Sequence, residues 1–233
     1  MYRVDTHVHT SEVSPCGRLS ADETVEGYLK AGYHAICISD HFNRGILKHY
    51  EGDWRQRVER WLQGYRAAKA AGDRQGLNVL LAAEVKLDEA RPDSQNEYLL
   101  YGLTEGFLLE QEELFALPFR DFVGRAHQNG VLVVQAHPFR PNMTIDEPSM
   151  LDGVEAFNGN PRHNSRNGEA LAFAYDHRLR PLSGSDCHQA EDLGRGGILV
   201  EKPVVTSRQL RDLIAANEYR LLPEGFEQAA AGE

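Results

Sequence analysis

Two histidines near the start of the chain have the spacing of a metal-binding pair. Residues 5–9 read Asp-Thr-His-Val-His. In an extended strand, residues i, i+2 and i+4 share one face, so Asp5, His7 and His9 should point in the same direction. Two imidazoles at this spacing can hold one divalent cation, and a nearby carboxylate can orient a ligating imidazole. Two surface histidines would have the same spacing, so the motif alone leaves both interpretations open.

Residue types that bind divalent metals recur at the ends of four further apolar runs. Histidine and carboxylate side chains are usual protein ligands of zinc, manganese and iron. In parallel α/β folds the carboxyl ends of the strands meet at one edge, so residues at these ends should converge on one cleft. A solvated side chain would explain any single case, but five such endings together predict a metal centre. The four further runs end in Asp40-His41, in Glu84, in His137 and in Asp186-Cys187-His188.

The elements that would position these residues alternate between apolar strands and amphipathic helices. Near-continuous apolar runs such as VLVV at 131–134 are typical of strands buried on both faces of a parallel sheet. Ser20 and Glu23 have the spacing of a capping box, and Thr206 or Ser207 can cap the last helix. This alternation predicts an α/β barrel or an open doubly wound sheet. The predicted strands cover residues 3–8, 34–39, 78–85, 98–103, 131–136, 153–157, 181–184 and 197–200, and the predicted helices cover 21–31, 54–71, 119–128, 165–176 and 207–217.

The length and net charge of the chain limit the classes of function that it can have. The chain has 233 residues, which suits a single barrel domain over 1–223, followed by a loosely ordered tail over 224–233. The formal net charge of −10 argues against binding of long nucleic acids or anionic membranes, but not of a small phosphorylated substrate. Three scattered cysteines predict no disulfide framework, and the first residues contain no apolar signal region. We therefore expect a cytoplasmic protein; its oligomeric state cannot be read from the sequence.

In order, the segments DTHVHT, SDH, AAEV, AHP and GSDCH resemble the signature of the PHP (polymerase and histidinol phosphatase) family. The resemblance runs from Asp5 to about Val200. It implies a distorted (β/α)7 TIM-like barrel and a cluster of up to three divalent metal ions, usually zinc, iron or manganese. It also implies hydrolysis of phosphomonoesters or phosphodiesters.

The resemblance implies one complete metal position and two incomplete ones. The first position takes the two histidines of the H-x-H motif, a bridging glutamate and an aspartate, all of which are present. The second lacks a histidine that would fall near Thr104, and the third lacks one in segment 11–17, where only Cys16 or Glu12 could substitute. A buried thiol without a metal role is an equal alternative for Cys16. We expect two ions, within a range of one to three. The implied metal ligands are His7, His9, His41, Glu84, His137, Asp186 and His188.

A hydroxide held between divalent metals is a strong nucleophile at neutral pH, so the chain is predicted to be a metal-dependent phosphoric ester hydrolase. Asp40 and Asp186 are the predicted catalytic carboxylates. Guanidinium groups fork onto phosphate oxygens, and the polar segment 158–166 is the expected substrate loop. His163 and His177 could protonate a leaving group, but the pattern favours a surface residue in each case. The predicted substrate contacts are Arg140, Asn158, Arg162 and Arg166, and the substrate would be a nucleotide, an amino-alcohol phosphate or an oligonucleotide end.

Two other functions remain open. An amidohydrolase also uses H-x-H and a final aspartate, and Lys86 could mimic the carboxylated lysine of that group. A degenerate PHP module that only binds a partner is the other alternative, since two metal positions each lack a ligand. The SDH and GSDCH segments favour a PHP protein over an amidohydrolase. The complete first metal position favours an enzyme over a non-catalytic module.

Overall fold

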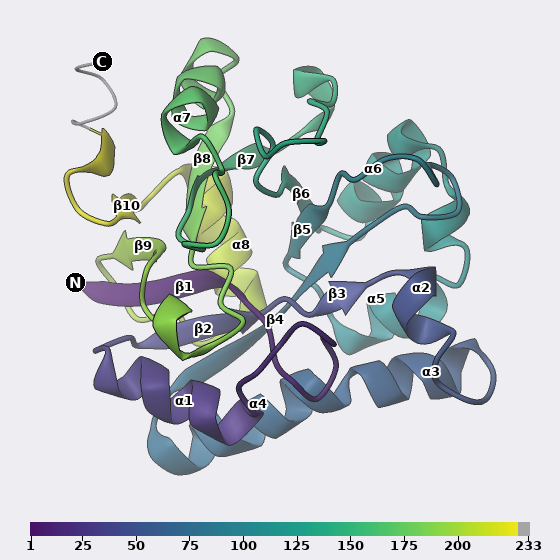
Figure 1. The fold of residues 1–233 in the computed structure, drawn as a ribbon, viewed down its shortest axis with the longest axis horizontal. Helices are drawn as coiled ribbons and strands as arrows, with labels where there is room; N and C mark the ends of the chain where they lie inside the picture. The colour runs from purple at the N-terminus through teal and green to yellow at the C-terminus, as the bar shows by residue number, and fades with distance from the viewer. Residues whose placement is uncertain (228–233) are drawn as a thin grey trace.

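The computed structural model describes residues 1–227, and ten strands in this range form one nearly closed barrel sheet (Figure 1). They are β1 (Tyr2–Val8), β2 (Ala35–Ile38), β3 (His41–Phe42), β4 (Asn78–Val85), β5 (Tyr98–Tyr101), β6 (Leu132–Gln135), β7 (Gly153–Asn158), β8 (Arg180–Gly184), β9 (Gly197–Val200) and β10 (Arg220–Leu222). Their order is β10-β9-β1-β2-β4-β5-β6-β7-β8, with β3 paired to β4. The sheet closes where β8 approaches β1. There, Cys187 forms an isolated parallel β-bridge with Val8, and the Thr6 hydroxyl donates to the Ser183 carbonyl oxygen over 2.7 Å. The predicted distorted TIM-like barrel is confirmed.

One strand inside the barrel runs against its neighbours. β5 is antiparallel to both β4 and β6, so Tyr98 at its start pairs with Val85 at the end of β4 and with Gln135 at the end of β6. The beginning of β5 therefore lies at the edge where its neighbours end. The pairs β1–β9 and β9–β10 are also antiparallel. The expectation of a parallel sheet is wrong for these strands.

Helices surround the sheet, and their ends follow the expected local signals. The capping box of Ser20 and Glu23 is present, and Thr206 forms a second one with Gln209. The helix predicted over 54–71 is two helices that meet at Leu62. The α-helices are α1 (Ala21–Lys30), α2 (Arg44–Leu47), α3 (Trp54–Trp61), α4 (Gln63–Gln75), α5 (Glu105–Glu110), α6 (Phe119–Gln128), α7 (Asn167–Asp176) and α8 (Ser207–Ala216).

Apolar side chains fill the space between the sheet and the helices. Ile36 and Ile38 of β2 pack with Val25 of α1 in one buried cluster, and Val4 packs with Ile214 of α8 in another. Of the predicted tail, residues 224–227 are described, and the Phe226 ring centroid lies 4.8 Å from that of Phe157. Residues 228–233 lie outside the described part. Within residues 1–227, no helix is long and apolar enough to cross a membrane.

Candidate metal centre

His7 and His9 bring their imidazoles together inside the barrel. Their Nε2 atoms are 3.0 Å apart, and both side chains are buried. The register between β1 and β2 shifts after Asp5, and such an irregularity interrupts the alternation of strand faces. Asp5 instead accepts a hydrogen bond from the hydroxyl of Tyr28 on α1 over 2.9 Å. The expected shared direction therefore holds for the two histidines but not for Asp5.

Two carboxylates complete a cage around these nitrogens. His7 Nε2 lies 3.4 Å from Glu84 Oε1 and 3.5 Å from Asp186 Oδ1. His9 Nε2 lies 3.4 Å from Glu84 Oε2 and 3.4 Å from Asp186 Oδ1. Ligand atoms placed ~2.1 Å from a tetrahedral ion are ~3.4 Å apart. These four side chains therefore have the spacing of a divalent cation site.

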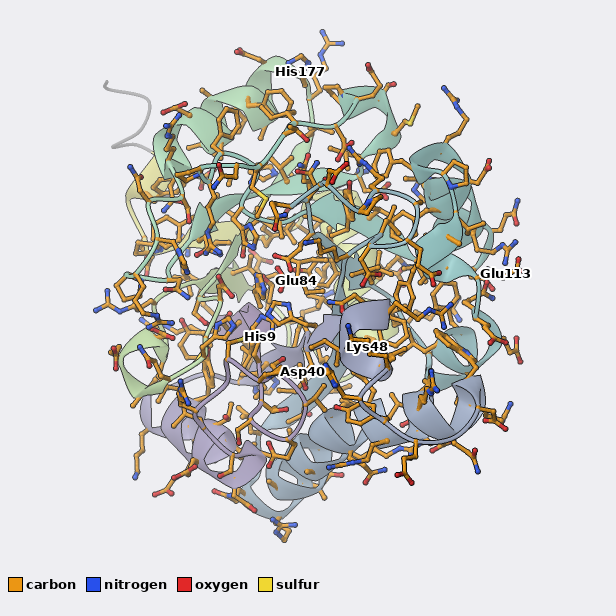
Figure 2. The ribbon with its side chains drawn as sticks, turned by 45° about the vertical axis from the view of Figure 1, so that its right-hand side comes forward. His9, Asp40, Lys48, Glu84, Glu113 and His177 are labelled. Carbon is orange, nitrogen blue, oxygen red and sulfur yellow. The ribbon has the colours of Figure 1, made fainter. Side chains whose placement is uncertain are left out.

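Glu84 is the central residue of the cluster, and Figure 2 shows it close to His9 in the interior. Its Oε1 lies 3.0 Å from His137 Nε2, and its Oε2 lies 2.8 Å from His41 Nδ1. Within residues 1–227, buried Glu84 Oε2 and His41 Nδ1 have no hydrogen-bond partner of proper geometry. Buried polar atoms without partners are costly, and a bound cation would satisfy both of these atoms. The donor set thus fits metal ions on both sides of Glu84.

Glu97 is a candidate ligand that the sequence analysis missed. It directly precedes β5, and its carboxylate oxygens lie 3.6 Å from His41 Nδ1 and 3.7 Å from His137 Nε2. His41, Glu84 and Glu97 form one group whose ligand atoms are within 4.8 Å of one another. The expectation of a ligand position near Thr104 was wrong because β5 is reversed, so the end of this strand lies at the opposite edge of the barrel. The apolar run that begins at Tyr98 correctly predicted a strand, but it did not indicate that this strand is antiparallel to its neighbours.

His188 and Cys16 extend the cluster next to His41. The His188 ring centroid lies 4.2 Å from that of His9, and the His188 Nδ1 is 2.9 Å from the carbonyl oxygen of Asp186. Cys16 is an exposed residue, not a buried one, and its thiol is close enough to His41 and His188 for both imidazoles to affect its pKa. Partial burial raises the pKa of Cys16, but the two imidazoles outweigh it and lower the pKa to about 6.

Glu12, the other residue that could replace the missing histidine, has a structural contact. Its Oε1 accepts the main-chain N–H of Ala21 over 2.9 Å, at the first residue of α1. A carboxylate is favourable at a helix N-terminus, where the first N–H groups have no partner inside the helix. This contact gives Glu12 a structural role at the start of α1.

The charges of the cluster are strongly interdependent. Burial alone would lower the pKa of His7, but the carboxylates of Glu155, Glu84 and Asp186 hold it well above the usual value. Burial lowers the pKa of His9 well below the usual value, and His188 and His41 add to this effect. Burial would raise the pKa of Glu84, yet the neighbouring His7 and His41 hold it well below its usual range. The cluster therefore contains ionised carboxylates at neutral pH, as metal binding requires.

Glu155 supports the cluster from β7 and was also missed. Its Oε1 lies 2.8 Å from His7 Nδ1, and its Oε2 accepts the main-chain N–H of His137 over 3.0 Å. A carboxylate on the far nitrogen of a ligating imidazole fixes its tautomer and orientation. A charged residue inside the apolar strand run GVEAF was the available signal.

Two of the predicted ligands have strained backbones. His137 has φ 28° and Asp186 has φ 51°. Non-glycine residues rarely adopt positive φ, and such strain concentrates at functional sites. Both residues directly follow apolar strand runs, so the strained conformation coincides with the turn of the chain into the site.

Asp40 is linked to His9 through Ser14, and both of its carboxylate oxygens accept hydrogen bonds. It accepts hydrogen bonds from the Thr10 amide (2.7 Å), the Thr10 hydroxyl (2.7 Å) and the Ser14 hydroxyl (2.8 Å). Ser14 Oγ is in turn 3.2 Å from His9 Nδ1. The structure thus places Asp40 where it fixes the loop after β1 and, through Ser14, the imidazole of His9.

Arg140 and Asn158 lie directly beside the cage. The Arg140 guanidinium donates to Asp186 Oδ2 over 2.6 Å and to Asn158 Oδ1 over 2.7 Å. Its Nε donates to the Ser165 hydroxyl over 3.0 Å. The Asn158 amide also donates to Glu155 Oε2 over 2.9 Å. The Arg140 guanidinium and the Asn158 amide therefore border the site at Asp186.

The other two predicted substrate arginines lie further out. Arg162 forms a two-pronged ion pair with buried Asp192, at 2.6 and 2.7 Å. Asp192 also accepts the main-chain N–H of His188 over 2.9 Å, so Arg162 helps to hold the segment that carries this histidine. Arg166 caps α7 with a left-handed backbone, and its guanidinium lies 3.8 Å from Glu169.

An open hollow of about 670 Å³ adjoins Arg140. His163 lines it, whereas His177 lies at the C-terminal end of α7, at the edge of the molecule (Figure 2). Gln95, which also lines the hollow, accepts a hydrogen bond over 3.2 Å from the ammonium of Lys86, the residue considered for the amidohydrolase alternative. The hollow is lined by Asp93, Gln95, Arg140, Pro141, Asn142, Met143 and His163.

The fold and the site define a barrel protein with a buried cluster of histidines and carboxylates. A family model described as PHP domain matches residues 5–154, and one described as PHP-associated matches residues 164–219. The chain belongs to the PHP-domain family. A search of curated proteins finds no match.

Several solved structures share the fold at low sequence identity. A two-domain protein from Bacteroides vulgatus, containing a predicted PHP-like metal-dependent phosphoesterase, matches with a TM-score of 0.67 and 16% identity, over 94% of this chain and 64% of that one. Endonuclease Q, in complex with a duplex that has an abasic lesion at the active site, matches with a TM-score of 0.58 and 16% identity, over 92% of this chain and 56% of that one. An amidohydrolase from Chromobacterium violaceum with bound sulfate matches with a TM-score of 0.54 and 17% identity, over 82% of this chain and 89% of that one. This chain thus spans less than two thirds of the length of the Bacteroides vulgatus protein and of endonuclease Q.

Proposed function

We propose that this protein is a metal-dependent hydrolase of phosphomonoesters or phosphodiesters. The observation that carries the proposal is the buried cage of His7, His9, Glu84 and Asp186, in which the two imidazole nitrogens lie 3.0 Å apart and 3.4 to 3.5 Å from the carboxylate oxygens. The Arg140 guanidinium stands directly beside this cage, and Arg140 also lines an open hollow that gives a substrate room to enter. A cation cluster next to an arginine is suited to an anionic phosphate group.

Each residue of the site has a role in this proposal. Divalent cations would supply an activated water and would neutralise charge on the phosphoryl oxygens. The cage residues, together with His41, His137 and His188, would hold these cations. Arg140 would orient a phosphate oxygen with its forked N–H groups, and Asn158 would hold Arg140 in place. Asp40 is assigned a positioning role through Ser14 and His9.

The proposed substrate is small and phosphorylated, such as a nucleotide, an amino-alcohol phosphate or an oligonucleotide end. The net charge of −10 disfavours long nucleic acids, because their backbone needs a basic footprint. The hollow beside Arg140 contains the carboxylate of Asp93, the amide of Gln95 and the imidazole of His163, which suit a polar leaving group. Among these groups, His163 is the candidate for protonating the leaving group.

A panel of phosphoesters tests the proposal, with inorganic phosphate and ammonia release measured in parallel after loading with Zn²⁺, Mn²⁺ or Fe²⁺. We expect phosphate release that Asp186→Asn abolishes, while Asp176→Asn, an exposed change on α7, leaves it intact. Ammonia release from amide substrates would support the amidohydrolase alternative. A protein that binds metal but turns over neither kind of substrate would support a non-catalytic module.

A further inference from the structure

Asp146, in the segment between β6 and β7, gathers three side chains from the start of β5 and the segment before it. Its Oδ2 accepts hydrogen bonds from the Asn96 amide over 2.7 Å and from the Tyr98 hydroxyl over 2.6 Å. Its Oδ1 accepts the guanidinium of Arg91 over 2.7 Å. Asn96 and Tyr98 are buried, and buried polar groups are costly unless they are hydrogen-bonded. One carboxylate therefore anchors both of these side chains.

Asp146 is itself held in place by its neighbours in the chain. Its main-chain N–H donates to Gln135 Oε1 over 3.2 Å, and Gln135 Nε2 donates to the Thr144 carbonyl oxygen over 2.6 Å. The Thr144 amide in turn donates to Asn96 Oδ1 over 2.9 Å. The end of β6, the segment that carries Asp146 and the residues before β5 thus form one connected network.

Glu97 lies in the chain directly between the two anchored residues. Side chains alternate between the two faces of extended backbone, so the residues before and after Glu97 share one face and Glu97 takes the other. Sheet pairing reaches this point, because the Ala136 amide donates to the Glu97 carbonyl oxygen over 2.9 Å. Anchoring on the outer face therefore directs Glu97 toward the metal centre.

The contacts of the Glu97 carboxylate inside the centre do not fix its position. Its oxygens lie 3.6 Å from His41 Nδ1 and 3.7 Å from His137 Nε2. Both distances exceed those of hydrogen bonds. The direction of Glu97 therefore comes from its backbone, which the two flanking side chains hold.

We propose that Asp146 is a positioning residue of the metal centre. By holding Asn96 and Tyr98 on one face, it keeps the Glu97 carboxylate on the other face, where Glu97 would serve as a ligand beside His41. The inference rests on metal binding at the centre, which the proposed function also requires, but not on turnover.

A double-mutant cycle tests this role by isothermal titration of the metal-free full chain with Mn²⁺, an ion that suits carboxylate ligands. Asp146→Asn should weaken the binding of one ion about 10- to 100-fold, and Glu97→Gln should weaken the same ion. Adding Asp146→Asn to Glu97→Gln should change the affinity by less than about twofold, because a positioning residue acts only through the residue that it positions. A general structural role would instead lower the affinity equally with and without Glu97.

The matched control removes an ion pair elsewhere in the molecule. Glu105→Gln breaks the two-pronged contact of Glu105 with Arg66, at 2.6 and 3.1 Å, between α5 and α4 and should leave Mn²⁺ binding unchanged. If Asp146→Asn does not fold, Tyr98→Phe, which removes one of the two anchoring hydrogen bonds, replaces it in the cycle.

The outcomes separate this inference from the proposed function. Unchanged Mn²⁺ affinity in folded Asp146→Asn, or an equal loss in the presence and absence of Glu97, would overturn the role of Asp146 and leave the proposed function standing. Normal results in the cycle, together with no phosphate release from any ester, would overturn the proposed function alone. A folded protein that binds no divalent ion would overturn both.

Discussion

Glu155 Oε1 lies 2.8 Å from Nδ1 of His7, with both side chains fully buried. The contact leaves Nε2 of His7 directed at His9, Glu84 and Asp186. A carboxylate on β7 therefore determines which nitrogen of a β1 histidine is available to a cation, although the two residues are 148 positions apart in the chain.

Glu155→Gln should weaken metal binding about 10- to 100-fold, the usual effect of losing a partner of a ligating histidine. The glutamine keeps the size of the side chain but not its charge, so the His7 imidazole loses its negatively charged partner. Isothermal titration of the metal-free protein with Zn²⁺ measures the change. Glu169→Gln, an exposed change on α7, is the matched control; equal affinities in both variants would contradict the role of Glu155.

Gly184→Ala should disrupt the centre, because the site has no room for another methyl group at this position. An added Cβ would lie 2.4 Å from His7 Cβ and 2.8 Å from Glu155 Oε1. Gly124→Ala is the control, since nothing lies within 4 Å of its added Cβ in α6. Thermal unfolding should show a lower Tm and no metal-dependent increase for the first variant. The second should be more stable by about 0.5–1 kcal/mol. A normal metal-dependent increase in Gly184→Ala would show that His7 tolerates displacement.

Arg140→Lys should raise KM for the phosphoester substrate about tenfold or more, because the lysine keeps the charge but loses the two-pronged geometry. Metal content should be retained, since the new ammonium still neutralises Asp186. Steady-state kinetics and elemental analysis separate the two effects. Arg120→Lys, on the exposed side of α6, provides the comparison. An unchanged KM in Arg140→Lys would remove this arginine from the substrate site.

Metal binding should release protons at neutral pH, because the pKa values of His7 and His41 are raised well above 6.5 in the metal-free protein. In both cases burial alone would lower the pKa, but neighbouring carboxylates outweigh it. The two imidazolium–carboxylate contacts therefore stabilise the metal-free fold fully below pH 6.5. This contribution is lost as pH rises through the raised pKa values.

The Tm of chelator-treated protein should fall as pH rises above 6.5, and the increase in Tm produced by metal should grow over the same range. Calorimetry in buffers of different ionisation enthalpy counts the released protons. Binding with no proton release, or a Tm increase independent of pH, would contradict these assignments.

Much of the site could be predicted because its residues follow strands whose apolar runs are unmistakable. His7, His9, Glu84 and Asp186 converge as expected of strand ends in a barrel. The capping signals at Ser20 and Thr206 were equally local and therefore readable.

The remaining features depend on relationships that a single chain does not display. Glu97 was missed because strand direction is set by pairing with β4 and β6, not by the composition of β5. Asp5 was misplaced because the irregularity in β1 arises from its register with β2. The ion pair of Arg162 with Asp192 was not foreseen, because the two residues are 30 positions apart in the chain.

Elemental analysis of the purified protein is the most direct test of the central claim that distant histidines and carboxylates hold divalent cations. We predict about two divalent ions per chain in the wild type and at least one fewer when His7 and His9 are both replaced by alanine. A well-folded wild-type protein that contains no divalent metal, even after loading, would contradict the account.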